Sequence, residues 1–328
     1  MATYSPFTAN MIQLGREATK GTAVPATVVY RGPAASIEDG SDVVMADENI
    51  GLIASAGRSY IPQIIARLAM PDTEATFEQL PHLLEASWMT ATPTGVGPYV
   101  YTYTKPSAAA GAIKTYTVET GNKIDNGGDS AEMAYGFVED WTLSGKANEP
   151  WKMAANWVGR QRNNAALTSL SVAAVEEILF NKTLLTIDAS GGTIGTTAIS
   201  GVLVDFSLSD KSGLQPVFTA DGQLYFTAHK SVKGELTGTI TLELNSDDAV
   251  ATLRTAKEAQ AVKLIRLAGS GSASRAITVD VSAKLTKIGT VQNSDGNTTV
   301  QVEFVAVYSS TDALYAEIEV TNILATLP

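Results

Sequence analysis

Apolar and polar residues alternate with a period of two along several segments of the chain, most clearly in its second half. In Gly234–Leu244, leucine and isoleucine occupy one face while glutamate and threonine occupy the other. Arg275–Lys287, Val300–Phe304 and Leu314–Val320 show the same alternation. Strands with one buried and one polar face are typical of antiparallel sheets packed into a sandwich or barrel. The pattern therefore predicts a mainly β fold.

Turn residues separate these runs where a β fold needs them. Asn293–Asn297 is expected to be a hairpin loop, and Asp221-Gly222 a turn between Val217–Phe218 and Leu224–Phe226. The strands expected in the first half are Tyr60–Leu68, Tyr99–Tyr103, Lys114–Glu119, Phe137–Ser144 and Trp151–Val158. Those expected in the second half are Val202–Ser209, Gly234–Leu244, Val262–Leu267, Ala276–Lys287, Thr299–Tyr308 and Leu314–Asn322.

Only two segments have helical spacing. Asp72–Trp88 places Phe77, Leu80 and Leu84 on one face, although Pro81 is expected to kink or shorten that helix. Ser246–Gln260 begins with a capping serine and two aspartates and continues with apolar residues at spacings of three and four.

The two predicted helices indicate an internal duplication. A shift of 173 residues pairs Phe77 with Val250 and Leu80 with Leu253. One strand precedes each helix and several follow it, in the same order. The predicted division is a first module over residues 1–165, with an N-terminal arm and an acidic loop, and a second over residues 175–328.

Three segments are expected to be loops or linkers: Pro106–Ala112, Asn163–Ser171 and Ala268–Ser274. The acidic stretch Ile37–Asn49 is expected to be a long exposed excursion. Together with Met1–Asn10, it is a candidate for a segment that becomes ordered only on contact between subunits.

The composition of the chain favours a protein with a large core and argues against a nucleic-acid-binding, disulfide-bonded or membrane-spanning protein. Hydrophobic residues make up 45% of the 328 residues and charged residues only 17%, which predicts a substantial core and a surface rich in uncharged polar groups. The net charge of −11 is opposite to that of a protein that grips nucleic acid. There are no cysteines, no signal-peptide pattern at Met1–Asn10 and no apolar run of about 18 residues, so we expect neither disulfides nor a membrane span.

The motifs that could carry chemistry are better interpreted structurally. Gly15–Thr22 resembles a phosphate loop, but its lysine precedes the glycine and no buried strand leads into it. His82 and His229 are the only histidines and lack the partners of a catalytic triad or metal centre. The sequence assigns no catalytic, cofactor-binding or metal-ligating residues, and it favours a protein that is not an enzyme.

Two further groups have a competing functional interpretation. Asp125–Asp129 and Asn293–Asn297 resemble calcium loops but lack the bidentate glutamate, so tight turns are expected. A set of aromatic residues could form a stacking platform for sugars or bases, but its parity favours a buried face. This set is Trp141, Trp151, Trp157, Tyr135 and Phe137.

A family resemblance emerges from the order of several short motifs. Ile12–Pro25, with its Glu followed by Gly-Thr-Ala-Val, resembles the start of many tail tube proteins of tailed bacteriophages. Phe137–Ser144 and Trp151–Arg160 resemble that family's central hairpin, and Val202–Val217 its strand and turn before the second sheet. Gly234–Asp248 resembles a strand leading into an acidic helix start, and Leu314–Asn322 the last strand.

This resemblance implies two tandem antiparallel β-sandwich or barrel modules of the tail-tube type, each with one flanking helix. The protein is then expected to be the major tail tube subunit of a virion, assembled in the host cytoplasm. Its partners would be further copies of itself, the tail terminator, the tape measure protein and the distal tail or baseplate proteins. Rings would stack around an acidic channel through which DNA passes without specific binding, and no membrane would be involved.

The duplication favours rings of three chains with pseudo-sixfold symmetry over rings of six chains. Two other functions remain open. A glycan- or receptor-binding sandwich of a virion or cell surface predicts an exposed aromatic cluster, whereas a carbohydrate-active enzyme predicts a buried pair of carboxylates in a cleft.

Overall fold

The computed structural model describes residues 6–54, 57–125, 128–199, 201–244, 249–294 and 296–328. Strands account for 48% of the structure and helices for 8%, which confirms the predicted mainly β class. The strands of the first half are β1 (Asn10–Arg16), β2 (Val28–Tyr30), β3 (Glu38–Asp39), β4 (Val44–Met45), β5 (Ser59–Tyr60), β6 (Ala66–Glu74), β7 (Tyr99–Thr104), β8 (Tyr116–Asn122), β9 (Ala131–Lys146), β10 (Lys152–Gly159) and β11 (Asn163–Asn164). Those of the second half are β12 (Thr183–Ala189), β13 (Leu203–Lys211), β14 (Leu214–Val217), β15 (Ala228–Ser231), β16 (Glu235–Glu243), β17 (Val262–Ser270), β18 (Ala276–Ile288), β19 (Gln292–Ser294), β20 (Asn297–Ala306) and β21 (Ala316–Asn322).

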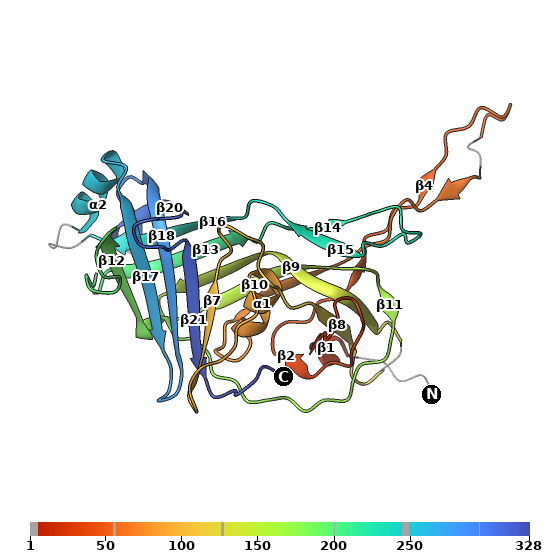
Figure 1. Cartoon of the computed structure of the whole chain (residues 1–328), viewed down its shortest axis with the longest axis horizontal. Coiled ribbons are helices and arrows are strands. Elements are labelled where there is room, and N and C mark those ends of the chain that lie inside the picture. The colour runs from red at the N-terminus through yellow and green to blue at the C-terminus, as the bar shows by residue number, and fades with distance from the viewer. Residues whose placement is uncertain (1–5, 55–56, 126–127, 200, 245–248, 295) are drawn as a thin grey trace.

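A long antiparallel sheet runs through both halves of the molecule (Figure 1). Its strands follow the order β3, β6, β10, β9, β13, β16, β20 and β18. The halves meet where Asp140–Lys146 of β9 pairs with Asp205–Lys211 of β13. This pairing makes one continuous sheet out of strands from both sides of the predicted module boundary. We call it the central sheet.

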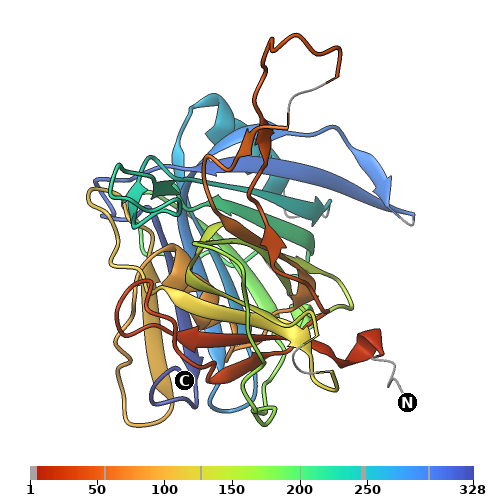
Figure 2. The ribbon, with the colours of Figure 1, turned by 90° about the vertical axis from the view of Figure 1, so that its right-hand side faces the viewer.

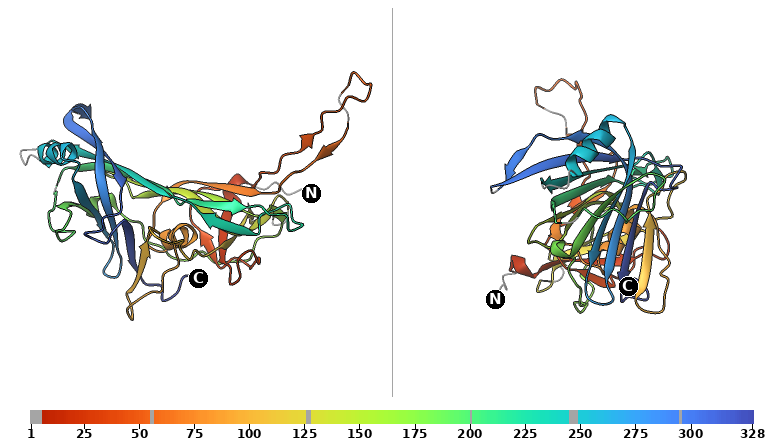
Figure 3. Two further views of the ribbon diagram at one scale, coloured as in Figure 1. Left: turned by 45° about the horizontal axis from the view of Figure 1, so that its top comes forward. Right: turned by 90° about the vertical axis from the view of Figure 1, so that its left-hand side faces the viewer.

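The two longest strands each belong to two sheets. The first part of β9 pairs with β8 and β11, and its second part pairs with β10 and β13. Likewise, the first part of β18 pairs with β21 and its second part with β20, while β17 lies along its other edge. The outer strands therefore turn away from the central sheet and enclose the core against it (Figure 3).

The helices are shorter than predicted. The helix expected over Asp72–Trp88 is α1, which spans only Leu80–Ser87, because residues up to Glu74 remain in β6. Pro81 lies in its first turn, where a proline has no intrahelical N–H bond to lose. The predicted helix Ser246–Gln260 is α2, whose described part is Ala249–Glu258. Its expected cap at Ser246, with Asp247 and Asp248, lies outside the described residues.

Strand pairing repeats between the two halves. Each of seven strands in the first half has a counterpart with the same neighbours in the second half. In the first half the pairs are β1–β8, β8–β9, β9–β10, β10–β6, β6–β3 and β9–β11. Their counterparts, in the same order, are β12–β17, β17–β18, β18–β20, β20–β16, β16–β13 and β18–β21. A helix follows β6 in one half and β16 in the other, and each packs near the corresponding long strand, β9 or β18. The residues matched by the 173-residue shift, Phe77 with Val250 and Leu80 with Leu253, are all buried.

Two segments break this symmetry by crossing between the halves. Strand β7 of the first half has no counterpart and pairs with β21 of the second. The segment Glu176–Phe180, which leads into the second half, lies against the first, where Ile178 donates its N–H to the carbonyl of Ala75. The main core is correspondingly one continuous cluster of buried side chains from both halves.

The described residues 40–54 and 57–64 belong to an arm that projects from the body (Figure 2). The predicted excursion Ile37–Asn49 begins too early, because Ile37 is buried and Glu38–Asp39 pairs with β6 as strand β3; only its later residues lie in the arm. The two sides of the arm pair at Val44–Tyr60 and Met45–Ser59. The equivalent loop of the second half is the hairpin β14–β15, which folds back instead onto the first half.

Candidate assembly surfaces

The solvent side of the central sheet is mainly polar, with Ala69, Ala154 and Val305 as apolar exceptions. The alternation that buries Leu208, Leu236 and Ile240 on one face leaves hydroxyls on the opposite face. One cross-strand row consists of Glu74, Lys152, Ser144, Ser207, Thr239, Glu303 and Lys287. The centre of this row is uncharged, and each end pairs a glutamate with a lysine.

Neighbouring charges on this face have opposite signs. Lys287 Nζ lies 2.9 Å from Glu303 Oε1, and the pairing of β9 with β13 places Lys211 opposite Asp140 and Lys146 opposite Asp205. A hollow of about 240 Å³ over these strands lies among Ser207, Thr239 and Glu303. Such a face is hydrophilic but offers few unpaired charges to a passing polyanion.

Each end of the central sheet has an open edge among the described residues. At one end, β3 pairs with β6 but with no other strand. At the other end, β17 stops opposite Lys284, so the last residues of β18 have β20 on one side only. Open edges carry unpaired backbone N–H and C=O groups that can pair with another chain.

The arm exposes apolar side chains far from the core. Ile50, Leu52 and Ile53 are 59%, 66% and 109% exposed, and Val43 and Met45 are also more than half exposed. A cluster of exposed apolar residues on a projecting segment is a mark of a contact surface.

A buried ion pair ties the two halves together. Lys105, which follows β7, places its Nζ 2.5 Å from Asp210 Oδ1 on β13, and the two side chains are 2% and 0% exposed. Trp88, which follows α1, donates its indole N–H to the other oxygen of Asp210 at 3.0 Å. Burial raises the pKa of Asp210 above its ordinary value, although the Lys105 cation and these hydrogen bonds act in the opposite direction.

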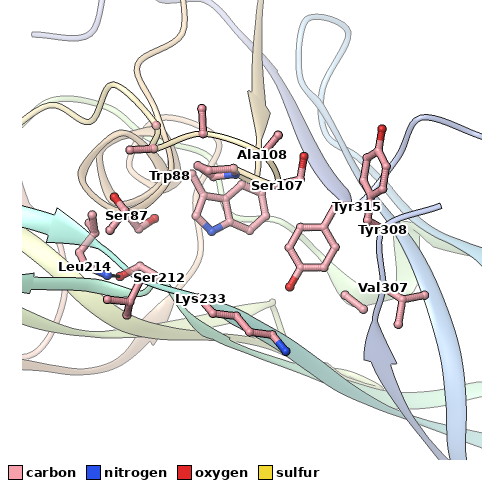
Figure 4. A pocket seen from close by; sticks show the side chains of 18 residues that line it. Ser87, Trp88, Ser107, Ala108, Ser212, Leu214, Lys233, Val307, Tyr308 and Tyr315 are labelled. Atoms are coloured by element: carbon pink, nitrogen blue, oxygen red, sulfur yellow. Dashed lines mark hydrogen bonds between the residues drawn. The ribbon is translucent and has the colours of Figure 1, made fainter. Parts of the chain in front are cut away.

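A pocket of about 550 Å³ lies beside this pair, at the junction of the halves. Figure 4 shows Trp88 and Ser107 on one side of it and Tyr308 and Tyr315 on the other, with Lys233 along its floor. The predicted loop Pro106–Ala112 supplies much of the wall.

A second buried polar network braces the first half. Arg16 of β1 forms a two-point hydrogen bond with Glu85 of α1, at 2.9 and 3.1 Å, and also donates to the carbonyl of Leu327. Tyr116 donates its hydroxyl to Glu85, so its oxygen accepts from Nδ1 of His82 at 3.1 Å.

Burial governs the protonation of this network. It raises the pKa of Glu85, with Arg16 and Tyr116 acting in the opposite direction. Burial and the nearby Arg16 cation lower the pKa of His82 to about 3, so this histidine is neutral at physiological pH. The network is enclosed, and its geometry suits it to hold β1, α1 and the C-terminal residues together.

The structure places the remaining sequence candidates in structural roles. All members of the aromatic set, including Trp141, Trp151 and Trp157, are buried, which confirms the predicted buried face. His229 on β15 is half-buried beside Tyr135 and Phe137. The expectation that no buried strand precedes Gly15–Thr22 is wrong, because β1 leads into it with Ile12 and Leu14 buried. The segment then forms a turn where Gly21 donates its N–H to the buried carboxylate of Glu17.

Parts of the two calcium-like loops lie outside the described residues, namely Asn126, Gly127 and Asp295. In their described parts, Gly128 donates to the carbonyl of Asp125, and Gly296 donates to the side chain of Asn293. Both are turn contacts, as expected for the tight-turn interpretation.

Nothing in the sequence indicated two carboxylates, Asp188 and Glu17, that accept hydrogen bonds from neighbouring loops. Asp188 on β12 accepts bonds from the backbone of Gly195, Thr196 and Thr197 and from the Thr196 hydroxyl. These bonds lower its pKa to about 2, although burial acts in the opposite direction. Glu17 is held in a similar way by Gly21, Thr115, Thr117 and Tyr135.

Within the described ranges, no cluster of three or more acidic or histidine side chains is placed to hold a metal ion. Neither of the helices found there is long and apolar enough to span a bilayer. Comparison with known proteins gives no assignment: no family model matches this chain, and no curated protein matches its sequence.

Proposed function

We propose that this protein is the major tail tube subunit of a tailed bacteriophage, a structural protein that polymerises into stacked rings. The observation that carries the proposal is the joint between β9 and β13. A repeated strand-and-helix unit meets its second copy there by edge pairing, and the result is one continuous sheet with a polar face.

The outer ends of that sheet are suited to continue the same arrangement. The first half presents the open edge of β3, and the second half presents the open end of β18. These edges differ, so pairing between chains is head to tail, and head-to-tail contacts form a ring where the rotation between neighbours closes. Each chain holds two units, so three chains supply the six units of the pseudo-sixfold ring that the resemblance to tail tube proteins implies.

The polar face of the central sheet is then the wall of the channel. Glu74 and Asp140 of the first half and Glu235 and Glu303 of the second supply acidic groups on this face, with lysines beside them. DNA passes such a wall without specific binding, because hydroxyls and paired charges leave little cationic potential to retain phosphates.

The arm is suited to join one ring to the next. Its exposed Ile50, Leu52 and Ile53 would be buried on stacking, and burial of large apolar side chains stabilises a contact by roughly 1.5–3 kcal/mol each. The remaining partners follow from the same assignment: a tail terminator, a tape measure protein and distal tail or baseplate proteins, in a virion assembled in the host cytoplasm.

Negative-stain microscopy of the concentrated protein tests the proposal. We expect tubes whose reconstruction has threefold symmetry with a sixfold repeat of similar units. Replacing Ile50, Leu52 and Ile53 together by serine should prevent stacking while leaving the melting temperature unchanged. Val96→Ser is the matched control, because Val96 is 97% exposed but lies away from the arm. Isolated particles at every concentration would instead favour a glycan- or receptor-binding module.

A further inference from the structure

The segment that leads into the second half fills a place beside α1. Ile178 is fully buried there, donates its N–H to the carbonyl of Ala75 and accepts from the N–H of Trp151. Two residues later, Phe180 begins the short 3₁₀ turn η2 (Phe180–Lys182) and is 6% exposed. Its ring stacks on Phe206, with centroids 6.1 Å apart.

The first half begins with the same local structure. The 3₁₀ turn η1 (Phe7–Ala9) leads directly into β1, as η2 leads directly into β12. Phe7 and Phe180 open the two turns and are separated by 173 residues (180 − 7), the shift that also relates β1 to β12 (183 − 10). Their environments differ sharply, because Phe7 is 74% exposed and Phe180 is buried.

The second half has a place that corresponds to the one beside α1 and that none of the described residues fills. After β16, Leu244 donates its N–H to the carbonyl of Thr298, as Ala75 after β6 donates to Trp151. Beside it lies a pocket of about 250 Å³ between α2 and the start of β20. Its lining is mainly apolar, with Leu244, Val250, Val291 and Val300, and also includes the charged Glu243 and Arg254. Leu244 and Val291 are 36% and 58% exposed.

This pocket has the size and chemistry for an aromatic ring. An apolar cavity of roughly 150 Å³ is sufficient to bind benzene, so about 250 Å³ accommodates a phenylalanine side chain. The described N-terminal residues do not reach this pocket in their own chain, because β1 and α2 lie toward opposite ends of the molecule (Figure 1).

We infer that Phe7 of one copy of this chain docks in the pocket beside α2 of the neighbouring copy. The contact extends between chains what the segment before β12 does within one chain. There Ile178 bonds to Ala75 and Trp151 of the preceding unit, and Phe180 donates its N–H to the carbonyl of Glu149, while the Phe180 ring stacks on Phe206 of its own unit. This inference rests on the head-to-tail assembly proposed above and adds the element that holds each joint between chains.

Disulfide trapping tests the contact directly, because the chain has no cysteine of its own. Phe7→Cys protein is mixed in equal amounts with Leu244→Cys or Val291→Cys protein, concentrated and oxidised. We expect a crosslinked dimer on a non-reducing gel with at least one of these partners. Phe7→Cys mixed with Val96→Cys is the control and should give no more crosslink than chance collisions.

The outcomes separate this inference from the proposed function. Tubes without a crosslink at either pocket position would overturn the docking of Phe7 and leave the tube assignment standing. A specific crosslink in protein that never forms tubes would support the docking and contradict the tube. Neither tubes nor a crosslink would overturn both.

Truncation of the side chain gives a quantitative check. Phe7→Ala should raise the protein concentration needed for assembly by about 10- to 100-fold, the factor expected for the loss of one buried aromatic side chain. Phe7→Leu keeps an apolar side chain and should assemble close to the wild-type concentration. An unchanged assembly concentration for Phe7→Ala would contradict the inference.

Discussion

Removing the carboxylate of Asp210 should destabilise the whole chain, because it leaves the buried Lys105 without a carboxylate partner and with only the carbonyl of Lys211 as a hydrogen-bond acceptor. The two side chains are 2% and 0% exposed, so water cannot replace the lost contact. Breaking a buried pair from one side costs about 3–5 kcal/mol. The indole N–H of Trp88 loses its acceptor in the same change. Since domains are stable by only about 5–15 kcal/mol, Asp210→Ala should remove a large part of the total.

Urea denaturation measures this loss, with the slope of the free energy against urea concentration checked for constancy between variants. The matched control is Glu303→Ala, which breaks an ion pair with Lys287 whose side chains are 36% and 67% exposed. That change should cost at most about 1 kcal/mol. The double variant Lys105→Met with Asp210→Leu should be more stable than Asp210→Ala, because it removes both charges together.

The reasoning fails if Asp210→Ala costs no more than the surface control. It also fails if the double variant is no more stable than the single one, since the penalty would then not arise from an unpaired Lys105. Because Lys105 follows a strand of the first half and Asp210 lies on a strand of the second, we expect one cooperative transition in the wild type.

Three further changes should have measurable effects. The pKa of Asp188 is lowered to about 2, so this carboxylate stabilises the fold above pH ~4 and ceases to do so as the pH falls toward 2. Asp188→Asn should cost about 1–2 kcal/mol at pH 7 and should weaken the decrease of the urea midpoint at acidic pH. The pKa of His82 is lowered to about 3, so below pH ~6.5 this histidine binds a proton in the unfolded chain but not in the folded chain. The free energy of unfolding should therefore fall by up to about 1.4 kcal/mol for each pH unit of acidification. Urea denaturation of His82→Gln between pH 6 and 4 should no longer show this pH dependence. A Cβ at Gly238 would lie 2.3 Å from the Phe304 ring, so Gly238→Ala should cost about 1–3 kcal/mol in the same assay, whereas Gly57→Ala, with open space around it, should be neutral.

Alternation predicted several strands of the second half well, because their apolar and polar residues alternate in sequence even where, as at Asp280 and Ser282 of β18, the polar face is also buried. Gly234–Leu244 contains β16, and Ala276–Lys287 matches β18 to within one residue at its end. The alternation fixes which side chains point inward, and the antiparallel sheet follows from it. Strand β12 was not predicted, because its central residues are buried on both faces and include the polar Thr186 and Asp188.

The first helix shows where local pattern fails. Phe77, Leu80 and Leu84 have helical spacing and are all buried, but Phe77 precedes the helix. Its N–H bonds to Glu176, almost a hundred residues away in the chain, so a tertiary contact decides where the helix starts. The crossing of β7 to β21 is equally non-local, and no feature within Tyr99–Thr104 marks it.

The candidate surfaces were predictable in part. The acidic stretch Ile37–Asn49 identified the start of the exposed arm, but Ile37 is buried and Glu38–Asp39 pairs with β6, so the arm begins later than predicted. The pairing of Lys105 with Asp210 could not be inferred, since a lysine and an aspartate 105 residues apart carry no signal of their contact until the sheet brings them together. The motifs behind the resemblance to tail tube proteins concern order along the chain, and nothing in them specifies which edges stay open.

The covalent link between the halves explains why two repeated units diverge. Within the chain, the joint at β9 and β13 is reinforced by Lys105 with Asp210, by β7 on β21 and by the buried segment Glu176–Phe180. A joint between chains, under the head-to-tail proposal, has the sheet edges and Phe7 but no second copy of β7 or of the buried ion pair. The inner joint therefore forms as part of folding, while the outer joint depends on protein concentration. A subunit built in this way folds as one stable body and still waits for its neighbours before it closes a ring, which identical joints of full strength would not allow.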